Sequence, residues 1–140
     1  MALLKGYKAL LADADAVVKT VPVEEVHARQ SDPNMVVLDI RDVRELKREG
    51  MLPSARHVPR GMLEFWAAPD SPYFKDWFGY PDKTYVLYCA SAWRSALAAK
   101  DLQDMGMDNI AHMAGGIKAW REAGFDVVPL PEKKKGKAQC

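Results

Sequence analysis

A cysteine and an arginine bracket a short stretch whose residue types suit nucleophilic chemistry. Cys89 follows the apolar run 85–88, and Arg94 stands in front of a helix-forming segment, with four residues between the two. A loop between a strand and a helix N-terminus presents backbone N–H groups that favour negative charge, so a cysteine there ionises more readily. Arg94 adds a fixed positive charge suited to an anionic substrate. The pattern fits a nucleophilic cysteine, and it also fits a small cysteine buried at a strand end.

Two apolar runs would supply the strands that position this loop. Residues 35–40 and 85–88 show no alternation of polar and apolar side chains, which is typical of strands buried on both faces of a parallel sheet. Asp39 lies near the end of the first run, and open α/β folds place their sites at the carboxyl ends of such strands. We therefore expect Asp39 and Arg41 near the loop. Arg41 and Glu45 also have the spacing of a local helical pair.

Short strands alternate with helices along the rest of the chain, and this order predicts an α/β fold. The expected fold is a three-layer sandwich, with a mostly parallel central sheet of about five strands and helices on both faces. Helices are expected over residues 3–14, 23–29, 43–49, 61–67, 94–105 and 115–124, and short strands over 17–21, 56–58 and 109–113.

An aromatic-rich segment, residues 62–80, separates two of the expected strands. Met62, Phe65 and Trp66 are its first bulky residues, and Pro72 has the position of a first helical residue after a turn. The segment is expected to cover the core. Its bulky side chains are also candidates for the wall of a pocket beside the loop.

The composition excludes several function classes. Lys plus Arg is 20 against 19 for Asp plus Glu, so no charge pattern indicates nucleic acid or a membrane surface. The two cysteines do not form a disulfide framework, and no histidine or acidic cluster has metal-ligand spacing, so neither metal nor organic cofactor is expected. The first residues do not resemble a signal peptide, so a cytoplasmic location is expected. We expect a helical extension over 1–16, one domain over 17–129 and a disordered basic tail over 130–140.

Three stretches together resemble the signatures of the rhodanese-like domain family. The first is residues 36–46, the second is the loop from Cys89 to Ser95, and the third is the Gly-Gly to Trp-Arg-Glu-Ala-Gly helix over 115–124. They occur in the family's order and spacing over about residues 20–128. The chain departs from the family pattern at Ala92, where glycine is common. Alanine there would cost about 1 kcal/mol or more if the backbone must be left-handed.

The resemblance implies transfer of sulfane sulfur through a persulfide on Cys89. The donor would be a small anion such as thiosulfate, and the acceptor would be cyanide or a thiol, in two half-reactions of covalent catalysis. The backbone amides of the loop and of the helix start would stabilise the anionic sulfur. Ser95 would cap the helix and could donate to the sulfur, and Asp39 would act as a supporting residue rather than a base. The substrate-binding residues would be Ala90, Ser91, Ala92, Trp93, Arg94 and Ser95.

Two other functions remain open on the same fold. Related cysteine phosphatases and arsenate reductases place five residues between cysteine and arginine, which leaves room for a tetrahedral oxyanion. The four residues here favour sulfur. A non-catalytic binding or regulatory module is the other alternative, which the presence of both Cys89 and Arg94 argues against and Ala92 slightly favours.

Overall fold

A five-stranded sheet forms the centre of the computed structural model, which describes residues 2–132. Its strands are β1 (Lys19–Val21), β2 (Met35–Asp39), β3 (Arg56–His57), β4 (Thr84–Tyr88) and β5 (Ile110–Met113). They lie in the order β1-β5-β4-β2-β3, and every pair of neighbours is parallel. This confirms the predicted parallel sheet. Asp39 pairs with Tyr88 in the register of β2 and β4, so both strands end at the same edge, next to Cys89.

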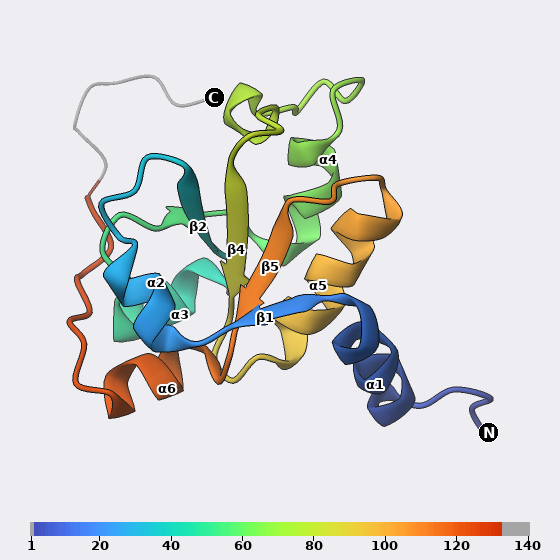
Figure 1. Cartoon of the computed structure of the whole chain (residues 1–140), viewed down its shortest axis with the longest axis horizontal. Helices are drawn as coiled ribbons and strands as arrows, with labels where there is room; N and C mark the ends of the chain where they lie inside the picture. Colours follow the sequence, from blue (N-terminus) through green and yellow to red (C-terminus); the bar gives the residue numbers. More distant parts are fainter. Residues whose placement is uncertain (1, 133–140) are drawn as a thin grey trace.

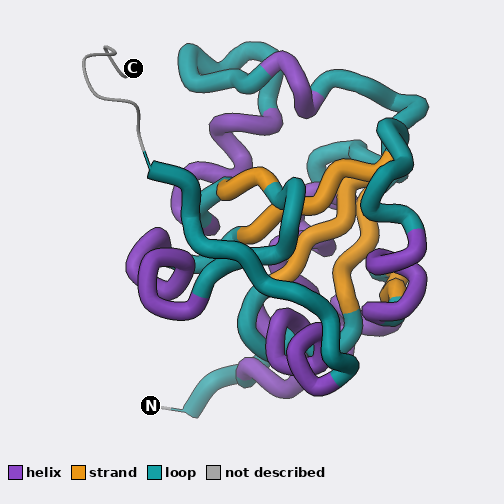
Figure 2. The backbone as a smooth tube through the Cα atoms, turned by 90° about the vertical axis from the view of Figure 1, so that its left-hand side faces the viewer, coloured by secondary structure: helices purple, strands orange, loops and turns teal. Residues whose placement is uncertain are grey.

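Helices cover both faces of the sheet, as predicted. The helices α2 (Val23–Ala28), α3 (Val43–Glu49) and α6 (Gly116–Glu122) lie on one side. On the other side are α1 (Tyr7–Val17), α4 (Leu63–Ala67) and α5 (Trp93–Asp104) (Figure 1). Figure 2 shows the strands side by side with helices around them.

Each face of the sheet has its own apolar core. One core joins Leu38, Tyr85 and Leu87 to the α5 residues Ala98 and Leu102. The other packs residues of β2, β4 and β5 against α2 and α6, with Trp120 fully buried. Burial on both faces explains why the strands appear in the sequence as unbroken apolar runs.

The first helix differs from the expected one in its position. It begins at Tyr7 because Gly6 is extended (φ −85°, ψ 177°), and it ends at Val17. Leu3 and Leu4, which the expected helix over 3–14 included, lie before the helix and are exposed. Ala14 is fully buried, and α1 packs on α5. The first strand consequently begins at Lys19 rather than at residue 17.

The helix expected after Pro72 does not form. The backbone there makes turns, with Tyr73 N donating to Ser71 Oγ at 3.0 Å, and then one 3₁₀ turn, η2 (Asp76–Phe78). The carbonyl of Trp77 accepts a hydrogen bond from Tyr85 Oη at 2.6 Å, and the Phe78 ring stacks on the Tyr85 ring. These contacts to β4 override the local helix signal. The expected helix over 61–67 forms as a 3₁₀ turn, η1 (Arg60–Met62), followed by α4.

Candidate active site

Cys89 is the first residue after β4, and its sulfur lies beneath the first turn of α5. The residue is 1% exposed. Its Sγ lies 3.4 Å from the backbone N of Ser95, which donates to it, and 3.6 Å from Ser95 Oγ. Ser95 does not cap α5, which corrects the expectation, because Ala92 is the N-cap residue. Ser95 instead lies inside the first turn, where its hydroxyl faces the sulfur.

The loop between Cys89 and α5 presents donors that its own backbone does not use. Among the described residues, no acceptor is paired with the backbone N–H groups of Ser91, Ala92, Trp93 or Arg94. Two of these belong to the first turn of α5, whose twelve residues place the positive end of the helix dipole at the loop. The loop is therefore suited to an anion next to the sulfur.

Ala92 adopts a left-handed backbone conformation, the case in which alanine at this position is costly. Its φ is +79° and its ψ is 0°, and the only other non-glycine residue with a positive φ in residues 2–132 is Ser54. Such a conformation costs an alanine about 1–2 kcal/mol relative to a right-handed one. The loop therefore reaches the shape that glycine would allow, with backbone strain at this residue.

The start of α6 fixes the backbone of the loop. Ile117 N donates to the Cys89 carbonyl at 3.0 Å, and Lys118 N donates to the Ala90 carbonyl at 3.2 Å. Gly116 makes this approach possible, because a Cβ at that position would lie 2.5 Å from the Ala90 oxygen. The glycine pair in the third signature therefore lies where α6 contacts the loop.

Arg94 lies on the rim of the loop and is paired with a glutamate of α3. Its Nη1 and Nη2 donate to Glu45 Oε1 and Oε2 at 2.8 and 3.0 Å. The hydrogen bonds from Arg94 lower the pKa of Glu45, so the carboxylate stays ionised and keeps the guanidinium in place. The local pair of Arg41 with Glu45 expected from the spacing is wrong, because Glu45 turns to Arg94.

Arg41 instead belongs to a buried polar network beneath the loop. Its Nη2 donates to Asp39 Oδ2 at 2.8 Å and to the Gly50 carbonyl at 2.7 Å, and Arg41 and Asp39 are both fully buried. Tyr88 Oη donates to the same Asp39 carboxylate and accepts from Leu52 N. Burial and the neighbouring carboxylate raise the pKa of Tyr88, so its hydroxyl remains a neutral donor. The network ties the ends of β2 and β4 together.

Two hollows border the loop, one on each side. One, of about 400 Å³, is lined by Ser91, Ala92 and Trp93 together with Asp15, Thr20 and His112. The other, of about 560 Å³, is lined by Ala90 and Ser91 with charged residues of α3 and α6. Within residues 2–132, no group of three or more histidine, cysteine or acidic side chains could bind a metal ion.

The expected pocket-wall residues lie elsewhere. Met62, Phe65 and Trp66 line neither of the two hollows at the loop. Phe65 borders a separate hollow of about 450 Å³, and Trp66 packs against the core. Their role as a wall of the active site stays a prediction.

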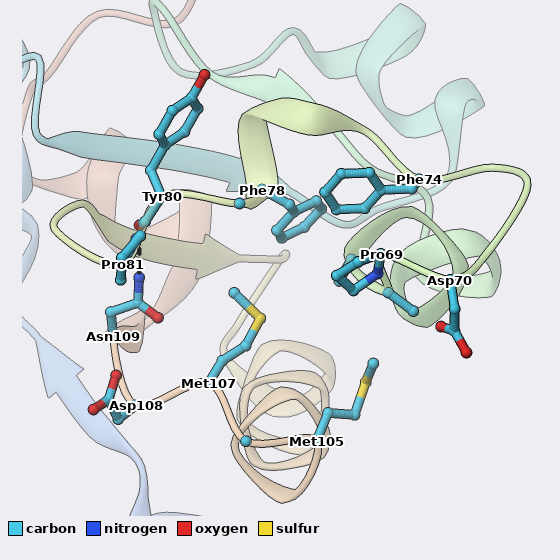
Figure 3. A pocket seen from close by; sticks show the side chains of 14 residues that line it. Pro69, Asp70, Phe74, Phe78, Tyr80, Pro81, Met105, Met107, Asp108 and Asn109 are labelled. Carbon is cyan, nitrogen blue, oxygen red and sulfur yellow. Dashed lines mark hydrogen bonds between the residues drawn. The ribbon is translucent and has the colours of Figure 1, made fainter.

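The aromatic segment does contribute to a hollow, which lies at the opposite end of the strands from Cys89. Figure 3 shows Phe74 and Phe78 facing Met105 and Met107 across this space of about 510 Å³. It lies before β4 and β5 begin, whereas Cys89 follows the end of β4.

The comparisons with known proteins agree with this geometry. The family model described as "Rhodanese-like domain" matches residues 22–123, so the chain belongs to the rhodanese-like domain family. An uncharacterized protein of Synechocystis is 32% identical over 100 residues, and the match covers 71% of this chain and 50% of that protein. The chain therefore spans half the length of this curated relative.

Two solved structures are similar over almost their whole length. A protein of unknown function from Rhodopseudomonas palustris, described as a possible tyrosine phosphatase, is 43% identical with a TM-score of 0.85. The match covers 91% of this chain and 98% of that one. The polysulfide-sulfur transferase homodimer of Wolinella succinogenes is 28% identical, with a TM-score of 0.69 and coverage of 94% and 93%.

Several residues of the site were not predicted from the sequence. Tyr88 and His112 lie inside apolar strands, where a polar side chain is easily read as core. Glu45 was expected as a local partner of Arg41 and within the first signature, not as the partner of Arg94. None of the helices within residues 2–132 is long and apolar enough to cross a membrane.

Proposed function

We propose that this chain is a sulfurtransferase that moves sulfane sulfur through a persulfide on Cys89. The observation that supports this most directly is the position of the sulfur, which accepts from Ser95 N beneath a loop of unpaired amides. A persulfide is anionic at neutral pH, and donors fixed in place before the reaction stabilise such charge without reorganising. Asp39 does not serve as a general base in this proposal, because its carboxylate already accepts hydrogen bonds from Arg41 and Tyr88.

The first half-reaction consumes an anionic donor such as thiosulfate. The Cys89 thiolate attacks the outer sulfur, a new S–S bond forms, and the bond between the outer sulfur and the sulfonate sulfur breaks. Sulfite leaves with the electron pair of that bond. Arg94, fixed by Glu45 at the rim, contributes the positive charge that attracts the donor.

The second half-reaction returns the enzyme to its starting state. A thiolate or cyanide attacks the outer sulfur of the persulfide and takes it, and Cys89 departs as a thiolate. The products are a new persulfide or thiocyanate. A reducing compartment such as the cytoplasm would keep Cys89 free for this cycle.

The test is the intact mass of the protein after treatment with thiosulfate. A Cys140→Ser background leaves Cys89 as the single cysteine. We expect the mass of one sulfur atom to be added and then removed by cyanide, with thiocyanate as product. Cys89→Ser in the same background should gain nothing. If that variant still acquires the sulfur, the mechanism is wrong.

The description of the Rhodopseudomonas palustris relative makes phosphatase chemistry the second candidate. The four residues between Cys89 and Arg94 leave a smaller loop than the five of related phosphatases. Hydrolysis of an aryl phosphate, without sulfur loading, would favour the phosphatase. Failure of both reactions in the folded protein would favour a non-catalytic binding module.

A further inference from the structure

A chain of polar groups leads from the buried Cys89 sulfur toward solvent, on the side of the loop that faces α1. Ser95 Oγ lies 3.6 Å from Cys89 Sγ and 3.0 Å from His112 Nδ1. The other ring nitrogen, His112 Nε2, lies 3.2 Å from Thr20 Oγ1. We call these four side chains the relay. Three of them, those of Cys89, Ser95 and His112, belong to residues that are at most 2% exposed, whereas Thr20 is exposed.

The outer end of the relay opens into a hollow. Thr20 and His112 both line the space of about 400 Å³ between α1 and the loop, and Cys89 does not. The sulfur is thus enclosed, but the imidazole two groups away borders a space that solvent can enter. Asp15 of α1 also lines this hollow and is the charged group that acts on His112.

The direction of the hydrogen bonds in the relay depends on the protonation of the sulfur. A thiol can donate to Ser95 Oγ, while the Ser95 hydroxyl donates to Nδ1 and Nε2–H donates to Thr20. A thiolate or persulfide can only accept, so Ser95 must donate to it. Ser95 can then accept from Nδ1–H, which requires the other tautomer of His112.

The two arrangements interconvert by one concerted set of proton shifts. The S–H proton moves to Ser95 Oγ, the Ser95 proton moves to His112 Nδ1, and the Nε2 proton leaves to a water or buffer base in the hollow. The net change is one thiol converted to one thiolate and one proton released. Thr20 then rotates its hydroxyl to donate to Nε2. The imidazole is neutral before and after the shift.

We propose that His112 is a positioning residue, which acts through Ser95 to favour the thiolate and persulfide of Cys89 and to conduct the thiol proton to the hollow beside α1. The inference rests on the proposed function only in taking Cys89 as the nucleophile. The environment supports a neutral ring. Burial lowers the pKa of His112, and the carboxylate of Asp15 opposes this effect. The polar contacts of the ring are Ser95 and Thr20.

The test measures the ionisation of Cys89 directly, without any sulfur donor. The rate of alkylation by iodoacetamide is followed against pH in the Cys140→Ser background, and its midpoint reports the thiol. His112→Leu removes both ring nitrogens, and Ser95→Ala breaks the relay with a small change of volume. The hydrogen bond from Ser95 Oγ to the charged sulfur contributes about 1.5–3 kcal/mol, so Ser95→Ala should alkylate roughly ten- to hundredfold more slowly below the midpoint. His112→Leu leaves the Ser95 hydroxyl in place without its own partner, so it should slow alkylation by a smaller factor. The midpoint should move to higher pH.

A conservative variant and a matched control separate positioning from packing. His112→Asn retains an amide donor near the place of Nδ1, so it should restore most of the rate that His112→Leu loses. His27→Leu removes an exposed histidine that stacks on Phe125 and has no contact with the relay, and it should leave the midpoint unchanged. Circular dichroism identifies any variant that fails to fold, and Ser95→Ala then carries the test.

Non-additivity is the decisive outcome. With Ser95 already replaced by alanine, His112→Leu should cause no further shift of the midpoint. An unchanged midpoint in His112→Leu, or full additivity of the two shifts, would overturn the proposal. Because alkylation needs no sulfur, these results stand even if thiosulfate fails to load Cys89.

Discussion

At the scale of single residues, Ala92 is the position where a substitution should make the folded protein more stable. Its left-handed backbone strains an alanine by about 1–2 kcal/mol. Glycine removes that strain but makes the unfolded chain more flexible, which offsets about 0.4–1 kcal/mol. Ala92→Gly should therefore raise the free energy of unfolding by roughly 0.5–1 kcal/mol, measured by urea denaturation.

The neighbouring alanine provides the control for this substitution. Ala90 lies in the same loop with an ordinary negative φ, so Ala90→Gly gains no relief of strain. It should lower the urea midpoint, because only the flexibility of the unfolded chain changes. If both glycine variants are destabilised equally, the left-handed conformation of Ala92 carries no strain in solution.

At the scale of elements, the contact between α6 and the active-site loop depends on Gly116. A Cβ there would meet the Ala90 oxygen at 2.5 Å and the Cys89 oxygen at 2.6 Å, in a backbone with φ +63°. Both atoms belong to backbone, which cannot rotate away. Gly116→Ala should therefore lower the free energy of unfolding by roughly 2–4 kcal/mol and displace the loop. The loss of sulfur loading on Cys89 would report that displacement.

Two other glycines separate the causes of this effect. Gly124 has φ +85° but open space around its Cβ position, so Gly124→Ala measures the backbone strain alone. Gly61 has open space and no positive φ, so Gly61→Ala should be neutral or slightly stabilising. If Gly116→Ala is no more destabilising than Gly124→Ala, the approach of α6 to the loop is not close.

The same elements show how much could be predicted from the sequence. The runs 35–40 and 85–88 predicted buried parallel strands, because burial on both faces leaves an unbroken apolar pattern. The pairing of Glu45 with Arg94 and of Asp39 with Tyr88 joins residues 49 positions apart. Only the strand order brings them together, so local spacing suggested Arg41 as the partner of Glu45. The prediction of a helix after Pro72 was wrong for the same reason, because contacts with the distant Tyr85 determine the conformation of that segment.

At the scale of the whole molecule, α1 lies outside the region that matches the family but packs on α5, which belongs to that region. The match begins at residue 22, and the sequence placed the start of the domain at residue 17. Ala14 and Val18 nevertheless lie in the core that α5 completes, and the Tyr7 ring lies 5.3 Å from that of Trp93 at the active-site loop. This packing indicates that α1 folds together with the sheet.

Removal of residues 2–18 tests this integration. The truncation uncovers apolar surface on α5 and removes Leu11 and Asp15 from the hollow at the outer end of the relay. Burial of two or three aliphatic side chains is worth about 1.5–3 kcal/mol each when complete, and Leu11 is only partly buried. We therefore expect the free energy of unfolding to fall by roughly 2–4 kcal/mol in urea denaturation. Removal of residues 2–4 alone should leave the free energy of unfolding unchanged, because Leu3 and Leu4 are exposed. Equal stability of the two truncated chains would show that α1 is an appendage rather than part of the folding unit.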